Sequence, residues 1–483
     1  MVEKTGNTVS CAFAGEQQPG MAELKFRDPV HNFIRFDGEE VALINLDVIQ
    51  RLRGIRQLAM ASLVYPGALH TRFDHTLGVA HVAGQMADEL RLDQDERRLV
   101  RWAALLHDIG HGPFSHVSEY ALDRFADRDV LREDLKQEKI HEVITNHLIR
   151  THESILRNLG QARCDAVARL LSKGLGEPVL KAVVSGPLDA DKQDYLLRDS
   201  LFAGVNYGVF DIHQLQRSLA CEKIDGQKEL VIRRDGVHAV EQFVMAKYYL
   251  TTMVYRHKVR LITDQMIARA IALGIERDEI AQLSELYSFD NSTKFYENYL
   301  CWNDAKFLHV FGENGPSGTK CTELIQRLIN RNLLKRVFYA SVKEFPADCK
   351  ETLVSLGKRE NANLREAIEQ EVAARIASEL NEKVEPDFTI LHTYQIKSVR
   401  ESSRNDEASI LVGKSPNPPG KFEEESVLFS SINERFADQY VEVYAPISWS
   451  DHAERNRRLN KLTASLKDVI TTSTNSVQLN IQI

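Results

Sequence analysis

Apolar side chains recur at the spacing of an α-helix along most of this 483-residue chain, and no other feature restricts its fold as strongly. The segment 48–59 and the segment that begins at Asp74 each place their apolar residues on one helical face. The sequence LVRWAALLHDIGHGP at 99–113 predicts a buried helix that stops at Gly110–Gly112, because glycine ends helices and Pro113 cannot continue one. Further helices are predicted over 189–202, 237–273, 321–338 and 364–380. We therefore expect a mainly α fold.

The residue pattern changes from helical to mostly strand-like after the helix predicted at 364–380. Strands are predicted within 387–399, 409–413 and 439–447, and a basic helix over 452–467. The resulting division has three parts: a flexible N-terminal tail (1–27), a large helical domain (28–345), and a small α+β C-terminal lobe (346–483). For the C-terminal lobe we predict a role in oligomerisation or regulation.

The charge balance and the cysteines exclude several classes of protein. With 61 basic and 69 acidic side chains, the net charge of −8 gives no overall attraction to nucleic acid or to an anionic membrane. A local basic groove for nucleic acid remains open. No run of 18 apolar residues occurs, so no membrane span is expected. The six cysteines are scattered singly, which is typical of reduced thiols, and we predict a cytoplasmic protein.

Histidine is concentrated in one stretch, because nine of the 16 histidines lie within 70–152. His75, the pair His107–Asp108 and Asp191 together offer imidazole and carboxylate ligands, which suit a divalent ion such as Fe, Mn, Zn, Co or Ni. The carboxylates also suit Mg²⁺. The His107–Asp108 pair falls near a predicted helix end, where the negative end of the helix dipole favours a cation. The alternative is two capped helices with hydrogen-bonded core histidines.

A phosphate site is predicted beside these residues. A new helix is expected to start at Gly112–Pro113, and its free N–H groups would bind phosphate. Arg72 could hold a phosphate oxygen. The alternative for Arg72 is a surface ion pair.

The helix predicted over 189–202 carries a row of chemically useful side chains. Asp191, Tyr195 and Asp199 recur every four residues and share one face, where they could hold a metal, a sugar ring and a sugar hydroxyl. Asp194 and Arg198 are predicted to form an ion pair on another face. The alternative is a solvated, charged helix.

Five segments carry a resemblance to a known family. H-T-R-F-D-H-T-L-G-V, L-L-H-D-I-G-H-G-P-F-S-H, I-H-E, D-A-D-K-Q-D-Y-L-L-R-D and V-Y-R-H-K-V occur in this order. Together they resemble the HD-domain phosphohydrolase superfamily, and more narrowly its deoxynucleoside-triphosphate triphosphohydrolase branch, without a sterile alpha motif. The resemblance runs from about Asp28 to about Phe338. It implies an HD-domain helical fold.

The resemblance also implies roles for individual residues. The implied metal ligands are His75, His107, Asp108 and Asp191. His116 is the implied general acid, with His111, His141 and Glu119 beside it. The implied substrate contacts are Arg72, Lys192 and Lys247 at the triphosphate, and Gln57, Tyr195, Asp199 and Tyr255 at the sugar and nucleoside. The implied regulatory phosphate contacts are Gln50, Arg53, His257, Lys258, Arg331 and Lys335.

The implied reaction is hydrolysis of a dNTP to a deoxynucleoside and tripolyphosphate, with Mg²⁺ entering alongside the substrate. The implied partners are nucleotide effectors and further copies of the chain, in an oligomer such as a tetramer. Two other functions stay open. One is a different HD phosphohydrolase, which acts on (p)ppGpp, a cyclic nucleotide or a nucleoside monophosphate. The other is a non-catalytic module that binds nucleotides or single-stranded nucleic acid.

Overall fold

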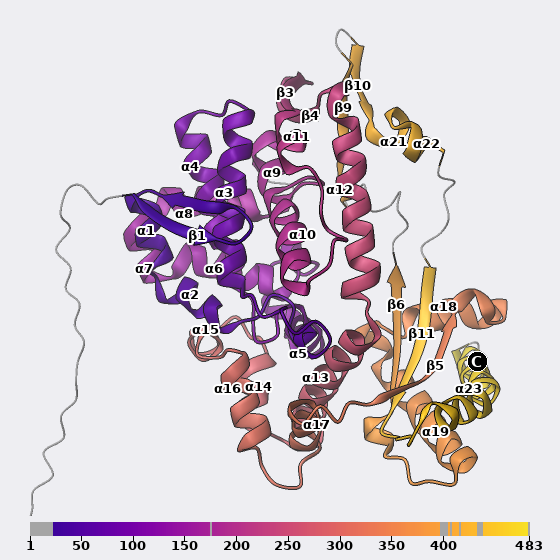
Figure 1. The fold of residues 1–483 in the computed structure, drawn as a ribbon. Coiled ribbons are helices and arrows are strands. Elements are labelled where there is room, and N and C mark those ends of the chain that lie inside the picture. Colours follow the sequence, from indigo (N-terminus) through magenta and orange to yellow (C-terminus); the bar gives the residue numbers. More distant parts are fainter. Residues whose placement is uncertain are drawn as a thin grey trace, which may run out of the picture.

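The computed structural model describes residues 23–173, 176–396, 404–405, 408–414, 417–431 and 438–481. Figure 1 shows a mainly α architecture with small sheets, in agreement with the apolar periodicity of the sequence. The strands are β1 (Leu24–Asp28), β2 (Asn32–Phe36), β3 (Leu219–Ile224), β4 (Gln227–Ile232), β5 (Lys335–Ser341), β6 (Ile390–Ile396), β7 (Arg404–Asn405), β8 (Ala408–Ser409), β9 (Leu411–Lys414), β10 (Asn417–Lys421) and β11 (Asp438–Ala445).

One large hydrophobic core unites the helices before residue 335. Their bounds are α1 (Gly38–Ile44), α2 (Asp47–Gln50), α3 (Arg72–Glu89), α4 (Gln94–Leu106), α5 (His116–Phe125), α6 (Ile140–Thr151), α7 (Glu153–Leu159), α8 (Gln161–Leu171), α9 (Pro178–Ser185), α10 (Ala190–Ala203), α11 (Ile212–Arg217), α12 (Val237–Leu250), α13 (Lys258–Glu276), α14 (Ala281–Tyr287), α15 (Thr293–Leu300), α16 (Asp304–Leu308) and α17 (Lys320–Ile329). Helix α3 is central, because it packs against both α4 and α10. These three helices carry the predicted metal ligands or end beside them.

The N-terminal tail predicted over 1–27 is wrong at its end. Residues Leu24–Asp28 form β1, which pairs antiparallel with β2. Asp28 ends this strand with a buried side chain that reaches Arg198. Residues 1–22 lie outside the described part of the chain.

Helix α4 ends earlier than its sequence predicts. It begins with a capping box at Asp93, in which Glu96 is the reciprocal partner, and its last helical residue is Leu106. The chain then turns, and the amide of His111 donates to the carbonyl of Asp108 (3.1 Å). The predicted stop at Gly110–Gly112 is therefore about one helical turn too late, and this places His107–Asp108 in the turn itself.

The helix predicted to start at Gly112–Pro113 starts at His116 instead. Phe114 and Ser115 adopt φ values of 61° and 57°, which a helix cannot continue through. The Ser115 hydroxyl holds this turn, because it donates to the carbonyl of Arg56 at 2.7 Å. The predicted phosphate-binding helix start at Gly112–Pro113 is accordingly wrong.

The single helix face expected over 48–59 is also interrupted. Helix α2 and a 3₁₀ turn (Arg51–Gly54) are followed by extended chain at Ile55. The Ile55 carbonyl accepts from the amide of Arg72 (2.9 Å), and the Gln57 amide donates to the carbonyl of His70 (3.1 Å). This pairing brings Gln57 to the start of α3.

The segment 237–273 forms two helices joined by one π-helical turn, Thr251–Tyr255. His257 caps the second helix, α13, by accepting from the amide of Val259. The π-helical turn adds a residue to the helical repeat, which is a common device at functional sites. Here it turns Tyr255 toward α10, where its hydroxyl reaches Asp199.

The C-terminal region holds a second hydrophobic core around an antiparallel sheet of order β5-β11-β6. Figure 1 shows this sheet beside α18 (Ala347–Ser355), α19 (Ala362–Leu380) and α23 (His452–Ile481). The helix predicted over 321–338 ends at Ile329, and its last part is strand β5. Residues from 335 onward thus pack with the C-terminal sheet, earlier than the predicted boundary at 345.

Part of the C-terminal region returns to the first core. Strands β9 and β10 join β3 and β4 in one sheet, of order β10-β9-β4-β3. The short helices α21 (Phe422–Glu425) and α22 (Val427–Ser430) follow, and Phe422 and Phe429 pack in the large core. The region 346–483 therefore divides between the two cores. Among the described residues, no helix combines the length and apolar character needed to cross a membrane.

Candidate metal centre and adjoining cavity

Three predicted metal ligands converge where α3 meets the end of α4. His75 lies on α3, His107 is the C-terminal cap of α4, and Asp108 follows it. One ligand atom from each lies within 4.8 Å of the other two. Asp191, in the first turn of α10, adds a carboxylate whose Oδ1 lies 2.9 Å from His75 Nε2 and 4.0 Å from His107 Nε2.

Both imidazole rings are oriented by their Nδ1 atoms. His75 Nδ1 lies 2.8 Å from Asp194 Oδ2, and His107 Nδ1 lies 2.7 Å from the carbonyl oxygen of Ala104. These contacts leave each Nε2 toward the cluster. His107 Nε2 is buried and has no hydrogen-bond partner within the described part of the chain. A pair of imidazoles held in this way, beside carboxylates, fits a divalent metal.

The electrostatics of the cluster favour positive charge. Burial alone would lower the pKa of His75, but the carboxylates of Asp191 and Asp194 raise it to about 10. Burial also opposes ionisation of Asp191, and contact with His75 nevertheless lowers its pKa to about 2. Asp108 is likewise buried, but Arg72 and neighbouring histidines hold its pKa well below the usual range. A cation at this position would meet carboxylates that are already ionised.

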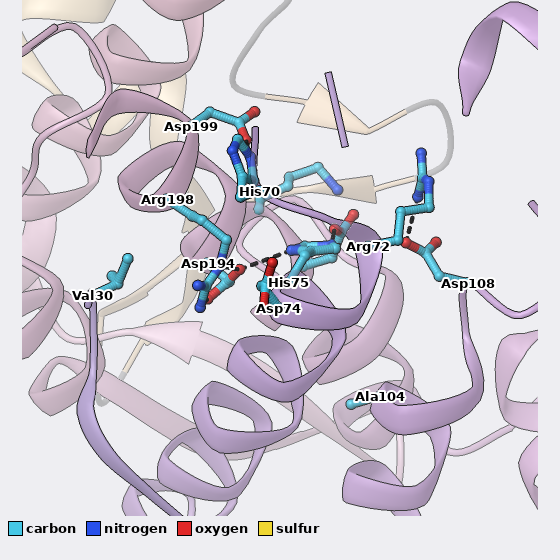
Figure 2. Close-up of polar contacts among 12 residues, drawn as sticks. Val30, His70, Arg72, Asp74, His75, Ala104, Asp108, Asp194, Arg198 and Asp199 are labelled. Atoms are coloured by element: carbon cyan, nitrogen blue, oxygen red, sulfur yellow. Dashed lines mark hydrogen bonds and ion pairs between the residues drawn. The ribbon is translucent and has the colours of Figure 1, made fainter. Parts of the chain in front are cut away.

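Asp194 supports the cluster from behind, and sequence reasoning assigned it only an ion pair on another helix face. Figure 2 shows its carboxylate between His75 and Arg198. Asp194 accepts from Arg198 at 2.8 and 2.9 Å and lies 2.7 Å from His31 Nε2. Arg198 also pairs with Asp28 at 2.8 Å. The predicted Asp194–Arg198 pair is present, but both side chains are fully buried instead of lying on a solvated face.

Arg72 reaches the metal cluster from the first turn of α3. Its Nη1 pairs with Asp108 Oδ2, and its Nε donates to the hydroxyl of Ser115 at 2.7 Å. Its Nη2 is buried without a hydrogen-bond partner among the described residues. The alternative of a surface ion pair is wrong, because the side chain is 2% exposed. Arg72 therefore offers one free donor beside the cluster.

A row of imidazoles joins the cluster to a cavity. His111 Nε2 lies 3.4 Å from Asp108 Oδ1, and its ring stacks on His141 with centroids 4.0 Å apart. His141 Nδ1 in turn lies 2.6 Å from Glu119. The His116 ring stands edge-on to His111 at 5.2 Å and is exposed to the cavity. Glu119 therefore orients the His141 ring.

The cavity beside His116 has a volume of about 300 Å³. Gln57, Tyr195, Asp199 and Tyr255 line it together with His116. The two Asp199 oxygens are held by the Tyr255 hydroxyl (2.5 Å) and by His70 Nε2 (2.7 Å). Gln57 Oε1 is buried without a partner in the described chain. The contact of His70 with Asp199 was not predicted from the sequence, although His70 lies only two residues before the predicted phosphate contact Arg72.

The two lysines predicted to contact the triphosphate, Lys192 and Lys247, lie in different places. Lys192 Nζ bonds to Asp189 (2.6 Å) and to the carbonyl of Gly186 (3.1 Å), at the start of its own helix. Lys247 lines a second, larger cavity that lies next to the first. Neither lysine lines the cavity that holds Tyr195.

The residues predicted to be regulatory fall into two groups. Gln50 and Arg53 bond to each other at 2.8 Å, and Arg53 lies over the Phe73 ring. His257 packs against Tyr65, and Arg331 donates to the carbonyl of Leu63. Lys258 is exposed and Lys335 is half-buried, with its pKa lowered by burial and by Arg331. Of these positions, His257 and Arg331 therefore reach the segment 61–65.

Comparison with known protein families decides the assignment. Residues 72–199 match the HD domain model, and residues 210–455 match the HD associated region model. This chain is a member of the HD-domain phosphohydrolase superfamily. The metal cluster lies within the HD domain match, and HD domains bind divalent metals.

Similar proteins agree with this assignment. This chain is 31% identical over 342 residues to the uncharacterized protein YwfO of Bacillus subtilis, and the match covers 67% of this chain and 74% of the relative. It is 27% identical over 327 residues to the deoxynucleoside triphosphate triphosphohydrolase SAMHD1 homolog of Dictyostelium discoideum, covering 64% of this chain and 59% of the relative. A crystal structure of a phosphohydrolase from Bacteroides thetaiotaomicron shares the fold, with a TM-score of 0.67 at 23% identity, over 88% of this chain and 100% of that one.

Proposed function

We propose that this HD-domain hydrolase converts a dNTP and water to a deoxynucleoside and tripolyphosphate. The observation that carries the proposal is the continuous arrangement of the His75–His107–Asp108 cluster, the imidazoles of His111 and His116, and the cavity that contains Asp199. Metal-assisted cleavage of a nucleotide at its 5′-oxygen uses a cation beside the phosphate, a proton donor at the leaving oxygen and a pocket for the sugar. The relatives that carry the dNTP triphosphohydrolase name support the same substrate class.

The proposed metal ligands are His75, His107, Asp108 and Asp191. They would hold one divalent ion from the set Fe, Mn, Zn, Co and Ni, with Mg²⁺ accompanying the substrate. A divalent metal in this position supplies Lewis-acid chemistry at a phosphoryl oxygen. Arg72, with its unpartnered Nη2, is proposed to bind an oxygen of the phosphate chain. Lys192 would join it after release from Asp189, and Lys247 would meet the far end of the chain.

His116 is proposed to donate its proton to the departing 5′-oxygen. In the free protein its pKa is lowered well below the usual value, because surrounding groups displace water and because Arg72 and His141 repel a proton. A triphosphate would reverse this effect, since its negative charge stabilises the imidazolium. His116 would thus become an acid only when substrate is bound. His111 and the His141–Glu119 pair position it.

The cavity is proposed to select a deoxyribose. Asp199 would accept from the 3′-hydroxyl, and the Gln57 amide would lie beside the same hydroxyl, while Tyr255 holds the Asp199 carboxylate in place. Tyr195 would occupy the space that a 2′-hydroxyl needs. Hydrolysis of rNTPs at the same rate as dNTPs would contradict this assignment.

The organisation around this site is also part of the proposal. Residues 28–345 would contain the catalytic machinery, and residues 346–483 would support oligomerisation or regulation. Gln50, Arg53, His257, Lys258, Arg331 and Lys335 are proposed to bind nucleotide effectors at the contact between copies of the chain.

Product analysis with each dNTP, singly and mixed, across Mn²⁺, Fe²⁺, Co²⁺, Ni²⁺, Zn²⁺ and Mg²⁺ tests the function. We expect free deoxynucleoside and tripolyphosphate, and a loss of about a hundredfold or more in kcat for Asp108→Ala. Asp235→Asn, an exposed aspartate at 71% side-chain exposure, is the matched control and should keep full activity. Release of monophosphate or pyrophosphate would assign the site to another HD phosphohydrolase. Binding without turnover under every metal would favour a non-catalytic nucleotide module.

A further inference from the structure

The larger cavity lies between the HD-domain helices and the C-terminal sheet. Its volume is about 530 Å³, a size that accommodates a nucleotide-sized ligand. Its walls come from α5, α12 and α13 on one side and from α19 and β6 on the other. In Figure 1, β6 lies beside the lower end of α12, where these two parts of the chain meet.

Cations dominate the lining of this cavity. The charged residues that line it are Arg124, Lys247, Arg256, Arg269, Arg359, Arg365 and Asp123. The single carboxylate, Asp123, already pairs with Arg128 at 2.6 Å. Cationic side chains therefore outnumber carboxylates in the lining, although the net charge of the whole chain is −8.

Three of these arginines have no carboxylate partner among the described residues. Arg365 Nη1 donates to the carbonyl of Leu356 at 2.8 Å, and Arg256 Nη2 donates to the carbonyl of Gln395 at 3.3 Å. Arg359 Nη1 lies 3.3 Å from the carbonyl of Ala126. Carbonyl contacts orient a guanidinium without pairing it to a carboxylate, so a bound anion would be favoured there.

The other two arginines fix the cavity wall. Arg124 bonds to Glu276 at 2.7 and 3.0 Å and to Glu366 at 2.9 Å, and so ties α5 to both α13 and α19. Arg269 bonds to Glu369 at 2.5 Å. Burial lowers the pKa of Arg365, and repulsion by Arg269 and Arg124 adds to this effect against the attraction of Glu369 and Glu366.

Aromatic side chains accompany the charge. Tyr120, Tyr248 and Tyr394 line the cavity, and the Arg256 guanidinium lies 5.0 Å from the Tyr394 ring centroid. His392 also lines it and is neutral, since burial together with Arg256 and Arg365 lowers its pKa to about 3. Aromatic faces beside clustered arginines are suited to a planar group that carries phosphates.

We propose that this basic cavity binds an oligophosphate anion, either free or attached to a nucleoside. Its lining contains none of the residues predicted to be regulatory, which are Gln50, Arg53, His257, Lys258, Arg331 and Lys335. The bound anion would hold α19 and β6 against α5, α12 and α13. Because Tyr120, Thr251, Arg256, Gln265 and His392 line both cavities, occupancy would also reach the cavity beside His116.

Binding of inorganic tripolyphosphate, measured by calorimetry on the full chain in metal-free buffer, tests the site. The Asp108→Ala background in metal-free buffer removes metal-dependent binding of the anion at the catalytic centre, and the arginine variants then show how much of the remaining binding belongs to the larger cavity. We expect this variant to bind tripolyphosphate, and Arg365→Gln in that background to weaken binding about tenfold or more. Arg375→Gln, on the same helix but outside the cavity lining, is the matched control and should leave binding unchanged. Arg359→Gln is a second test, because its side chain is exposed and its loss should be tolerated by the fold.

Hydrogen exchange in the presence of tripolyphosphate should show protection over 356–366 and 390–396. A dNTP that binds this site with the same affinity as tripolyphosphate would show that the phosphates alone are recognised, and tighter binding would show that the aromatic rings also hold the nucleoside. Unchanged binding in both arginine variants, or protection confined to other segments, would overturn the proposal. Absence of dNTP hydrolysis would contradict the proposed function without affecting these measurements.

Discussion

Asp194 offers a sharp test of how the metal cluster is built, because it touches no predicted substrate group. Its carboxylate is fully buried, holds His75 Nδ1 at 2.8 Å and compensates Arg198 at 2.8 Å. Replacement by asparagine keeps the shape but removes the charge. We expect His75 to lose the partner that fixes the orientation of its ring.

Two magnitudes follow for Asp194→Asn. Removal of a carboxylate that orients a metal-bound histidine lowers metal affinity about 10- to 100-fold. Loss of one partner of a buried ion pair costs about 3–5 kcal/mol of unfolding free energy. The lower end of that range applies here, because Asp28 still pairs with Arg198 at 2.8 Å.

The assay is competition for Mn²⁺ or Zn²⁺ with a fluorescent chelator, on protein whose folding is checked by circular dichroism. Glu369→Gln is the matched control, since this buried carboxylate pairs with Arg269 and accepts from the amide of Leu391, outside the metal cluster. It should lower stability by a similar amount and leave metal affinity unchanged. Folded Asp194→Asn protein with a metal affinity within twofold of the natural chain would refute the reasoning.

Two further predictions concern stability. His392 has a pKa of about 3 in the folded state, mainly from burial, against about 6.5 unfolded, so acidification below pH 6.5 costs about 1.4 kcal/mol per pH unit. His392→Leu should flatten this dependence in urea unfolding between pH 6.5 and 5, and an unchanged slope would contradict it. Gly110→Ala would place a methyl group 2.2 Å from the carbonyl oxygen of His141, so we expect a loss of about 1–3 kcal/mol and lower activity. Gly357→Ala, whose nearest contact would be 3.3 Å, is the control, and equal unfolding midpoints for the two variants would argue against the clash.

Local spacing was enough to predict much of the helical architecture. The helix over 364–380 corresponds to α19, and the basic helix from His452 corresponds to α23. The helix predictions were wrong where contacts with distant segments end a helix early. The strand β5 follows α17 because it pairs with β11, more than 90 residues away, and no periodicity within 321–338 records that pairing.

Some residues of the candidate site were likewise evident from the sequence, and others were not. His107–Asp108 was evident from a motif next to a helix end, and the structure brings it to His75. The partners of Asp194 were not evident, because His31 and Asp28 come from the first strands and reach α10 only in the folded chain. The basic cavity likewise draws its five arginines from five separate helices or turns.

The amino-acid sequence by itself determined which segments become helices and which residue types can bind a metal, because helical spacing and ligand chemistry are local properties. Only the tertiary structure decided which charges share a low-dielectric interior. Arg198 and Asp194 are an ordinary i,i+4 pair in the sequence, but full burial beside His75 makes them the support of a metal cluster. Burial depends on packing between distant segments, and it is burial that turns a common pair of charges into a strong electrostatic constraint.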